Sequence, residues 1–448
     1  MNSPVAVGAD TFCSVDTDHS FYDEPSRRLP VLDQADVLVL GGGPGGIGAA
    51  LAAARNGART ILVERTGSFG GNWTAGILGT IMPSPQVHGI FRELVESFGK
   101  RQGWRQWGET YGGGGTYDIE TARLVLDEVV VSSGVIPYFY TQFSDVIREG
   151  NRLTGVIVES KQGRQVIRAD QFIDSTGDGD VSVRAGASYD KGREKDGGMQ
   201  PMTMIFMMDH VDNDSISPWW HEQPECLQAW KDAKARGEVT VPREDVLAFQ
   251  MPRKGQWSIN TTRILGKDGT RIRDLTDATI EARRQVAEIV AFLKKYIRGF
   301  ENAVLLETAP NIGVRETRRI HCDYTITADD ILKVPAFEDC IARGSNFIDI
   351  HNPAGEGTTL VFPPKGKWYE IPYRSVRVRG LDNLLIASRC LDSTHEAHAA
   401  IRVTNQIMAV GEGAGTAAAL CARDRLPSTR DLDPARLREA LRAKGAFV

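Results

Sequence analysis

The sequence predicts an α/β protein with a parallel central sheet, into which an α+β unit is inserted. Three observations lead to this prediction. Residues 35–64 run through a strand, a glycine-rich turn, a helix and a second strand. Short apolar segments at 172–174 and 381–389 fit further strands of the same sheet. Between them the composition changes, which indicates a separate unit within an alternating strand–helix pattern.

The first strand–turn–helix unit carries a dinucleotide-binding pattern. The apolar run Val37–Leu40 is followed by Gly41, Gly43 and Gly46, and then by an Ala-rich helical stretch. Gly41 allows the tight turn, Gly43 lets the backbone approach a pyrophosphate, and Gly46 lets helix and strand pack closely. The helix N-terminus offers unpaired N–H groups to the phosphates. This order predicts a Rossmann-like domain.

The residues after the second strand favour FAD over NAD. Thr60–Val63 is apolar, and Glu64 at its end can accept hydrogen bonds from the adenosine ribose. A further loop of small residues follows and contains the doublet Gly70–Gly71. An NAD-dependent dehydrogenase does not need such a loop, whereas extended FAD lies along it. An ordinary flexible loop over Gly70–Gly76 is the alternative.

The rest of the first domain follows in order. Residues 124–133 predict a helix, 136–140 a core strand, 143–149 and 153–160 a strand pair, and 165–169 a third strand. Phe172–Asp174 then leads into the small-residue segment Ser175–Asp180. Ligands of open α/β sheets lie at the carboxyl ends of the strands, so this segment is expected beside the cofactor.

The inserted unit is rich in Met and Trp. Met199–Met208 is strand-like, residues 213–260 hold four of the eight tryptophans, and Thr276–Phe300 predicts an amphipathic helix capped by Thr276. Large apolar side chains of this kind belong more often to a core than to a pocket. A docking patch at Trp219-Trp220 is the alternative.

The chain then returns to the first domain. Leu381–Arg389 predicts a buried strand and Ala399–Leu420 a long helix. Gly411, Gly413 and Gly415 weaken that helix, which makes sense if another backbone or a flat cofactor packs against it. We expect an N-terminal arm at 1–34, an FAD-binding domain at 35–198 and 372–425, a substrate domain at 199–371 and a C-terminal tail at 426–448. A second glycine motif is missing, which disfavours a built-in NAD(P)H domain.

Composition narrows the functional classes. The net charge of −5 disfavours nucleic acid, and no stretch is long and apolar enough to predict a membrane span. The N-terminal residues lack the pattern of a secretory signal, so a cytoplasmic location is expected. The six cysteines form no C-x-x-C pair, so we expect no metal or iron–sulfur site.

Two further segments complete a family resemblance. They are Ile312–Arg319, with the sequence IGVRETRR, and Ile386–His398, with IASRCLDSTHEAH, followed by Ile401-Arg402-Val403 and GEGAGTAA. With the glycine motif, they resemble FAD-dependent oxidoreductases related to the fumarate reductase and succinate dehydrogenase flavoproteins, which have a glutathione-reductase-like FAD fold. The likeness extends from about Asp23 to Ala422. It implies FAD as the cofactor and leaves the substrate open.

The resemblance also implies positions for FAD contacts. The ADP half is expected at Gly41, Gly43, Gly46, Glu64 and Arg65, the diphosphate and ribityl chain at Gly71, Asn72, Thr74 and Gly76, adenine at the backbone of Phe143, the pyrophosphate side at Thr176, Gly177 and Asp178, and the pyrimidine edge at Arg402 and Val403. Trp73 departs from the small or Met-like residues that are usual there, and we expect it to shape the pocket. No residue indicates a covalent flavin link.

Three residues are candidates for catalytic roles. His395 precedes the final helix and suits proton abstraction, although helix capping or a hydrogen bond to FAD is an equal alternative. Arg315 suits a substrate carboxylate or the reduced flavin, with ion pairing between domains as the alternative. Tyr373 is a further candidate, and His351 is more often a solvated loop residue.

The favoured function is the removal of two hydrogens from a small molecule, with a secondary metabolite among the options. Oxygen or an external carrier is the electron acceptor, and a homodimer is one option for the assembly. A flavin monooxygenase or halogenase ranks lower, because W-x-W-x-I-P is missing and the last FAD strand ends in Ser-Arg-Cys. A protein acting on a carrier-tethered substrate, or a flavin-binding scaffold, is the remaining alternative.

Overall fold

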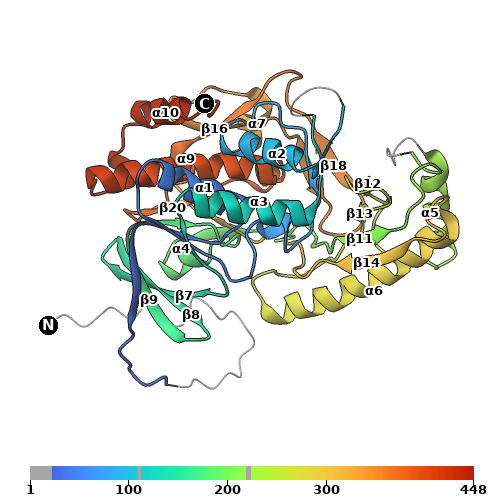
Figure 1. The fold of residues 1–448 in the computed structure, drawn as a ribbon, viewed down its shortest axis with the longest axis horizontal. Helices are drawn as coiled ribbons and strands as arrows, with labels where there is room; N and C mark the ends of the chain where they lie inside the picture. Colours follow the sequence, from blue (N-terminus) through green and yellow to red (C-terminus); the bar gives the residue numbers. More distant parts are fainter. Residues whose placement is uncertain (1–22, 109–112, 218–222) are drawn as a thin grey trace.

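The computed structural model describes residues 23–108, 113–217 and 223–448. Its main sheet has the strand order β6-β2-β1-β9-β8-β7, and β20 pairs with β9 (Figure 1). These strands are β1 (Val31–Leu40), β2 (Thr60–Val63), β6 (Ile136–Tyr138), β7 (Gln142–Glu149), β8 (Arg152–Ser160), β9 (Gly163–Asp174) and β20 (Leu384–Ile386). All neighbours are parallel except β7–β8 and β8–β9. The predicted α/β class with a parallel central sheet is confirmed.

One long strand replaces two predicted ones. β9 includes both segments expected as separate strands, because β1 pairs with it almost without interruption, from Ala35 opposite Ala169 to Leu40 opposite Asp174. The polar residues between the segments therefore lie within the ladder and not in a loop. The first half of β9 pairs with β8 and its last residues with β20. β1 itself begins at Val31, inside the segment expected as an arm.

Two glycine-rich helices pack backbone to backbone against the sheet. They are α1 (Pro44–Arg55) and α9 (Thr404–Asp424), which lie side by side in Figure 1. A Cβ atom on Gly411 would lie 2.0 Å from the carbonyl oxygen of Gly45, and one on Gly415 would lie 2.0 Å from that of Ala49. The close partner of these two glycines is therefore another backbone and not a flat cofactor. α2 (Ile90–Lys100) and α3 (Ile119–Ser132) contact α1.

A second, smaller sheet projects from the main body, on the right in Figure 1. Its order is β12-β13-β11-β14, formed by β11 (Phe206–Asp209), β12 (Ala248–Gln250), β13 (Trp257–Ile259) and β14 (Val304–Thr308). α5 (Pro224–Ala235) and α6 (Ile272–Tyr296) accompany it. Trp230, Trp257, Phe292 and Phe300 are buried in its own hydrophobic core. Trp219 and Trp220 lie outside the described residues.

The Met-rich run and the long helix differ in detail from the prediction. Along β11, Phe206 and Met208 belong to the core of the smaller unit, whereas Met207 belongs to the main core, so the run joins the two. α6 begins four residues before Thr276, whose hydroxyl donates to the carbonyl oxygen of Ile272 within the helix. The predicted Thr276 cap is therefore wrong.

The remaining strands and α-helices of the described residues complete the fold. They are β3 (Thr80–Ile81), β4 (Trp104–Gln106), β5 (Gly115–Tyr117), α4 (Asp180–Arg184), β10 (Tyr189–Lys191), β15 (Arg318–Ile320), α7 (Ala328–Lys333), β16 (Cys340–Gly344), β17 (Ile348–His351), β18 (Thr358–Val361), β19 (Tyr369–Pro372), α8 (His395–Ile401) and α10 (Pro434–Ala443). Leu437 and Leu441 of α10 are buried in the main core, within the segment expected as a tail. The domain boundaries stay a prediction. Among the described residues, no helix has the length and apolar character to cross a membrane.

Candidate functional site

A cavity of about 990 Å³ lies between the carboxyl ends of the parallel strands and the smaller unit. Its size is at the upper end of the range for ligand pockets, about 300–1,000 Å³. Most of the predicted site residues line it: Gly41, Gly43, Glu64, Arg65, Gly71, Asn72, Gly76, Phe143, Thr176, Gly177, Asp178, Arg315, Arg402 and Val403. Gly46, Thr74, His395 and Tyr373 are not on its wall.

The glycine turn has open space at one residue and tight backbone contacts at the others. A Cβ atom on Gly43 would meet no heavy atom within 4 Å, so the backbone there faces the open cavity. At Gly41, with φ +104°, a Cβ would lie 2.2 Å from the carbonyl oxygen of Ser175. At Gly46 it would lie 1.8 Å from that of Gly41, which is why Gly46 packs behind the wall. An approaching pyrophosphate therefore fits at Gly43, the residue before the first turn of α1.

Glu64 is buried at the cavity edge, and its carboxylate is already hydrogen-bonded to the protein. One oxygen accepts the N–H of Gly42 at 2.8 Å, and the other accepts the N–H and hydroxyl of Thr66 at 2.7 and 2.9 Å. Each carboxylate oxygen can accept more than one hydrogen bond, so a ribose contact remains available. Glu64 also braces the turn, a role that the sequence pattern does not reveal.

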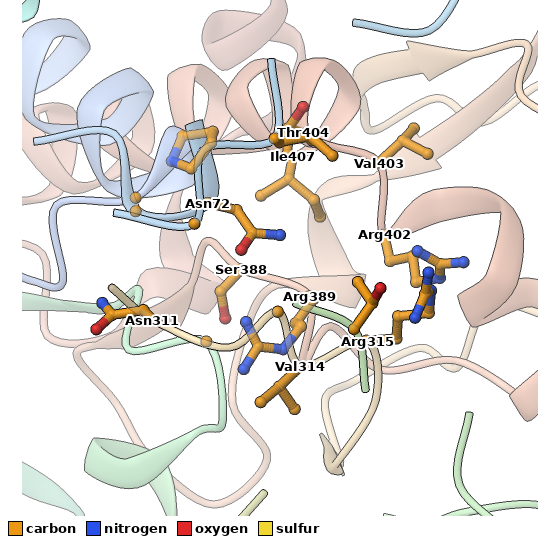
Figure 2. Close-up of a pocket in the computed structure, with 18 of the residues that line it drawn as sticks. Asn72, Asn311, Val314, Arg315, Ser388, Arg389, Arg402, Val403, Thr404 and Ile407 are labelled. Carbon is orange, nitrogen blue, oxygen red and sulfur yellow. The ribbon is translucent and has the colours of Figure 1, made fainter. Parts of the chain in front are cut away.

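The second small-residue loop reaches the cavity with only some of its expected contacts. Asn72 and Gly71 line the wall, and Figure 2 shows the Asn72 amide directed into the cavity. The Thr74 hydroxyl is buried and donates to the carbonyl oxygen of Phe69, so its expected FAD contact is not supported. Trp73 is fully buried against Phe98 and Tyr117 and does not shape the pocket as expected.

Asp174, at the end of β9, shapes the next segment of the wall. Its carboxylate accepts the N–H of Thr176 at 3.1 Å and the N–H of Ser182 at 2.8 Å. This turn presents Thr176 and Asp178 to the cavity, where Asp178 accepts a hydrogen bond from Arg389 at 2.6 Å. Asp178 is therefore neutralised by Arg389.

The N-terminus of α9 forms the opposite wall. The helix predicted over 399–420 is two helices, because α8 ends at Ile401 and α9 starts at Thr404. Val403 occupies the position before α9, and its side chain does not cap the first N–H groups of the helix. Thr404 and Ile407 line the cavity beside them (Figure 2). A positive helix end of this kind suits an electron-rich group.

Two arginines lie together at the end of the cavity next to the smaller unit. Figure 2 shows the guanidinium groups of Arg315 and Arg402 close to one another. Arg315 is 9% exposed and donates to the carbonyl oxygen of Pro201 at 2.7 Å. Burial, together with the charges of Arg402 and Arg243, lowers the pKa of Arg315 well below its usual value. Burial likewise lowers the pKa of Arg402, although the carboxylate of Asp349 opposes this.

Arg315 forms no ion pair with a carboxylate of the described residues. The other guanidinium groups near it each have a carboxylate partner: Arg243 with Asp245 at 3.4 Å, Arg263 with Glu244 at 3.3 Å and Arg402 with Asp349 at 3.8 Å. Among the described residues, no carboxylate lies within ion-pair distance of Arg315. This end of the cavity therefore carries one net positive charge, which is costly to bury without an anion.

His395 is the principal difference between expectation and structure. It is 5% exposed, its Nδ1 lies 2.9 Å from a carboxylate oxygen of Glu316, and the same oxygen accepts a hydrogen bond from Arg319 at 2.5 Å. The ring belongs to a buried polar cluster behind the wall and does not reach the cavity. Thr394, and not His395, caps α8.

Tyr373 is also in the core. It is fully buried, and its hydroxyl donates to the carbonyl oxygen of Thr429 at 2.9 Å. This position, away from the cavity wall, is inconsistent with the predicted catalytic role.

Asp349 and His351 on β17 line the cavity instead. Sequence reasoning missed Asp349 and placed His351 in a solvated loop. Residues two apart on a strand share a face, so the alternation Ile348-Asp349-Ile350-His351 is the signal that could have found them. Among the described residues, no cluster of three or more His, Cys, Asp or Glu could hold a metal ion.

Comparisons with known proteins identify the family of this chain. The family described as FAD dependent oxidoreductase matches residues 36–441. A thiamine thiazole synthase of Pyrococcus horikoshii is 29% identical over 168 residues, which cover 36% of this chain and 62% of the relative. Baeyer-Villiger monooxygenase 4 of a Dietzia species is 45% identical over 93 residues, which cover 20% of this chain and 15% of the relative. The matches thus span less than two thirds of either relative.

Among solved structures, a myxobacterial FAD-dependent chondrochloren halogenase superimposes with a TM-score of 0.50 at 15% identity. The superposition covers 92% of this chain and 79% of the halogenase. At this identity the likeness shows a shared fold only.

Proposed function

The chain belongs to the FAD-dependent oxidoreductase family, which matches residues 36–441. We propose that it oxidises a small organic molecule carrying one negative charge, such as a carboxylate. The substrate loses two hydrogens from a C–O, C–N or C–C bond. The enzyme is a dehydrogenase or an oxidase, depending on whether a carrier or oxygen takes the electrons. The narrower relationship to fumarate reductase flavoproteins stays a prediction.

FAD supplies the two-electron acceptor when it is bound. The open backbone at Gly43 and the N-terminus of α1 would hold its pyrophosphate, and Glu64 its ribose. Gly71 and Asn72 would line its path, and the N-terminus of α9 would meet an electron-rich edge of the ring. These assignments rest on the cavity wall and on the family.

The observation that carries the substrate proposal is the unpaired charge of Arg315. An isolated buried guanidinium is unfavourable, and a ligand carboxylate that accepts a bidentate pair of hydrogen bonds removes that cost. Apolar side chains, among them Ile205, Leu247 and Phe249, also line the cavity. A small organic anion, with an apolar body and one charged end, matches both features.

The test uses the FAD-loaded enzyme under anaerobic conditions. A panel of small carboxylic acids is mixed with the enzyme, each beside its methyl ester, and the flavin band is followed at its visible maximum. We expect at least one acid to bleach the flavin much faster than its ester. In Arg315→Gln the KM for that acid should rise by about 10- to 150-fold, which corresponds to the loss of a charge-assisted hydrogen bond of about 1.5–3 kcal/mol.

Arg315→Lys is the matched control, because it keeps the charge and loses the planar pair of donors. Its KM should lie between those of wild type and Arg315→Gln. Esters that bleach the flavin as fast as their acids would contradict the anionic substrate. Retained FAD in both variants separates a substrate effect from a cofactor effect.

Oxygen transfer is the second candidate. Its support is the similarity to a protein named as a Baeyer-Villiger monooxygenase, over 93 residues only. Rapid flavin reduction by NADPH, followed by incorporation of labelled oxygen into the product, would favour this candidate over the first.

A further inference from the structure

A fully buried arginine fixes the orientation of the cavity histidine. Arg263 is 1% exposed and donates from one nitrogen to the carbonyl oxygens of Gly355 and Gly357 at 3.1 and 3.2 Å. Its other terminal nitrogen lies 3.0 Å from Nδ1 of His351. Glu244 balances its charge at 3.3 Å. Arg263 therefore has little freedom to move away from His351.

The pairing decides which nitrogen of His351 carries the hydrogen. A guanidinium group has donors only, so Nδ1 of His351 must be the acceptor and cannot hold a proton. The hydrogen of the neutral ring is then on Nε2, which lies 3.4 Å from a carboxylate oxygen of Asp349. His351 thus offers an N–H to Asp349 or to a substrate oxygen, and it has no free lone pair with which to take a proton.

Of the three carboxylates at this end of the cavity, Glu244, Asp245 and Asp349, Asp349 is the one that pairs with both His351 and Arg402. Glu244 accepts hydrogen bonds from Thr358 at 2.8 Å and from Gly357 at 3.2 Å. Asp349 has its side-chain contacts at 3.4 Å to His351 and 3.8 Å to Arg402. No lysine or tyrosine is among the described residues that line the cavity. Asp349 is therefore the best-placed proton acceptor, with Arg315 close enough to influence its charge.

We propose that Asp349 accepts the substrate proton, while Arg263 holds His351 as a neutral Nε2–H donor that positions Asp349 and the substrate oxygen or nitrogen. The assignment rests on the proposed oxidation and narrows it to an alcohol or amine carbon. With FAD bound as the two-electron acceptor, the substrate C–H hydrogen would leave with its electron pair to the flavin, the O–H or N–H proton would pass to Asp349, and a C=O or C=N bond would form. No further oxidant is required.

The charges around β17 agree with these roles. His351 contacts Arg263 and Asp349, and the charges of Arg315 and Arg402 also act on it. The neighbouring helix α8, which packs against β17, carries two further titratable groups, His395 and His398. Burial and the charge of Arg315 lower the pKa of His351 to about 3, although Asp349 opposes this. The ring is therefore neutral at physiological pH.

Asp349 is ionised before substrate binds. Burial raises its pKa, but the hydrogen bond from His351 and the charges of Arg402 and Arg315 together hold the pKa well below its usual range. A substrate carboxylate between the two guanidinium groups offsets their charge and raises the pKa of Asp349. The substrate thus makes Asp349 a stronger base where the proton is removed.

The first experiment needs no substrate. The holoenzyme is labelled with ¹⁵N-histidine, and the His351 signals are identified, among those of the eight histidines, as the ones lost in His351→Gln. We expect an unprotonated Nδ1, a protonated Nε2 and no titration between about pH 5 and pH 9. In Arg263→Met, Nδ1 loses its donor, so a form of the ring with the hydrogen on Nδ1 should appear beside the Nε2–H form, while burial and the charge of Arg315 still keep the ring neutral. A wild-type His351 with a hydrogen on Nδ1, or one titrating in this range, would overturn the assignment.

The second experiment uses the acid that bleaches wild-type flavin in the panel described above. Asp349→Asn is nearly isosteric and should keep its FAD, yet its flavin reduction should slow by about 10²- to 10⁴-fold. Asp349→Glu should recover part of the rate, and His351→Gln, which retains an N–H, should be affected less than His351→Leu. Flavin reduction in Asp349→Asn at the wild-type rate would refute Asp349 as the acceptor. If no acid in the panel reduces the flavin, the proposed function is contradicted. The assignment of His351 is still tested, because the histidine measurement needs no substrate.

Discussion

Replacing Gly43 with valine separates the binding of FAD from the stability of the fold. Gly43 has φ −71° and ψ −178°, an extended conformation that any residue adopts. A Cβ there would meet no protein atom within 4 Å, so the apoprotein has room for the side chain. The valine methyl groups instead enter the cavity, where the pyrophosphate is expected. The substitution should therefore act on the cofactor and leave the folded chain almost unchanged.

The magnitudes differ enough to be measured separately. Changing the residue before α1 costs at most about 1 kcal/mol, part of which is offset by the lower chain entropy of the unfolded state. Losing one charge-assisted hydrogen bond from the backbone to a phosphate costs about 1.5–3 kcal/mol, or about 10- to 150-fold in the Kd of FAD. Urea unfolding of the apoprotein and titration with FAD, followed by flavin fluorescence, measure the two quantities.

Gly46→Ala is the matched control. Its Cβ would lie 1.8 Å from the carbonyl oxygen of Gly41, so the backbone must shift and the apoprotein itself should lose stability. Wild-type affinity for FAD in Gly43→Val would refute the pyrophosphate site. A Gly43→Val apoprotein as unstable as Gly46→Ala would show that the open space at Gly43 does not exist.

Three further changes test neighbouring features. Glu64→Gln should weaken FAD binding by about 10- to 100-fold. It should also lower the free energy of unfolding by about 1–2 kcal/mol, because the carboxylate accepts hydrogen bonds from its own loop. An unfolding curve identical to that of wild type would exclude this structural role. Burial raises the pKa of Glu412 to about 7, so wild type should lose up to about 3 kcal/mol of stability as pH rises from about 4.5 to 7. Glu412→Gln should avoid this loss and be the more stable protein at about pH 8. If the urea midpoints of the two proteins differ by the same amount at every pH, Glu412 is not the cause of the loss. Tyr373→Phe should lower the free energy of unfolding by about 1–2 kcal/mol, since the carbonyl oxygen of Thr429 loses its donor, and should leave flavin reduction unchanged.

The dinucleotide half of the site was predictable because its signal is local. Gly41, Gly43 and Glu64 lie within one strand–turn–helix–strand unit, so spacing alone brings them together. Residues that follow other strands of the same sheet, such as Thr176 just after β9, meet them because parallel strands end at one edge. The errors here concern side chains, as at Thr74, because spacing does not tell which face of a turn is buried.

The substrate half was not predictable in the same way, because its geometry depends on contacts between distant segments. Arg263, after β13, meets His351 on β17, and Arg315, before β15, lies beside Arg402 at the junction between α8 and α9. His395 has the residue type and the sequence position expected of a base, yet a single buried acid, Glu316, holds it behind the wall. Residue type gives the chemistry a side chain can perform, whereas the hydrogen-bond partner decides whether the side chain is available for it. For His351 the partner is an arginine, which occupies the Nδ1 lone pair, so the ring cannot accept a proton and can only donate its Nε2–H. The role of base therefore falls to Asp349, two residues away on the same face of the strand.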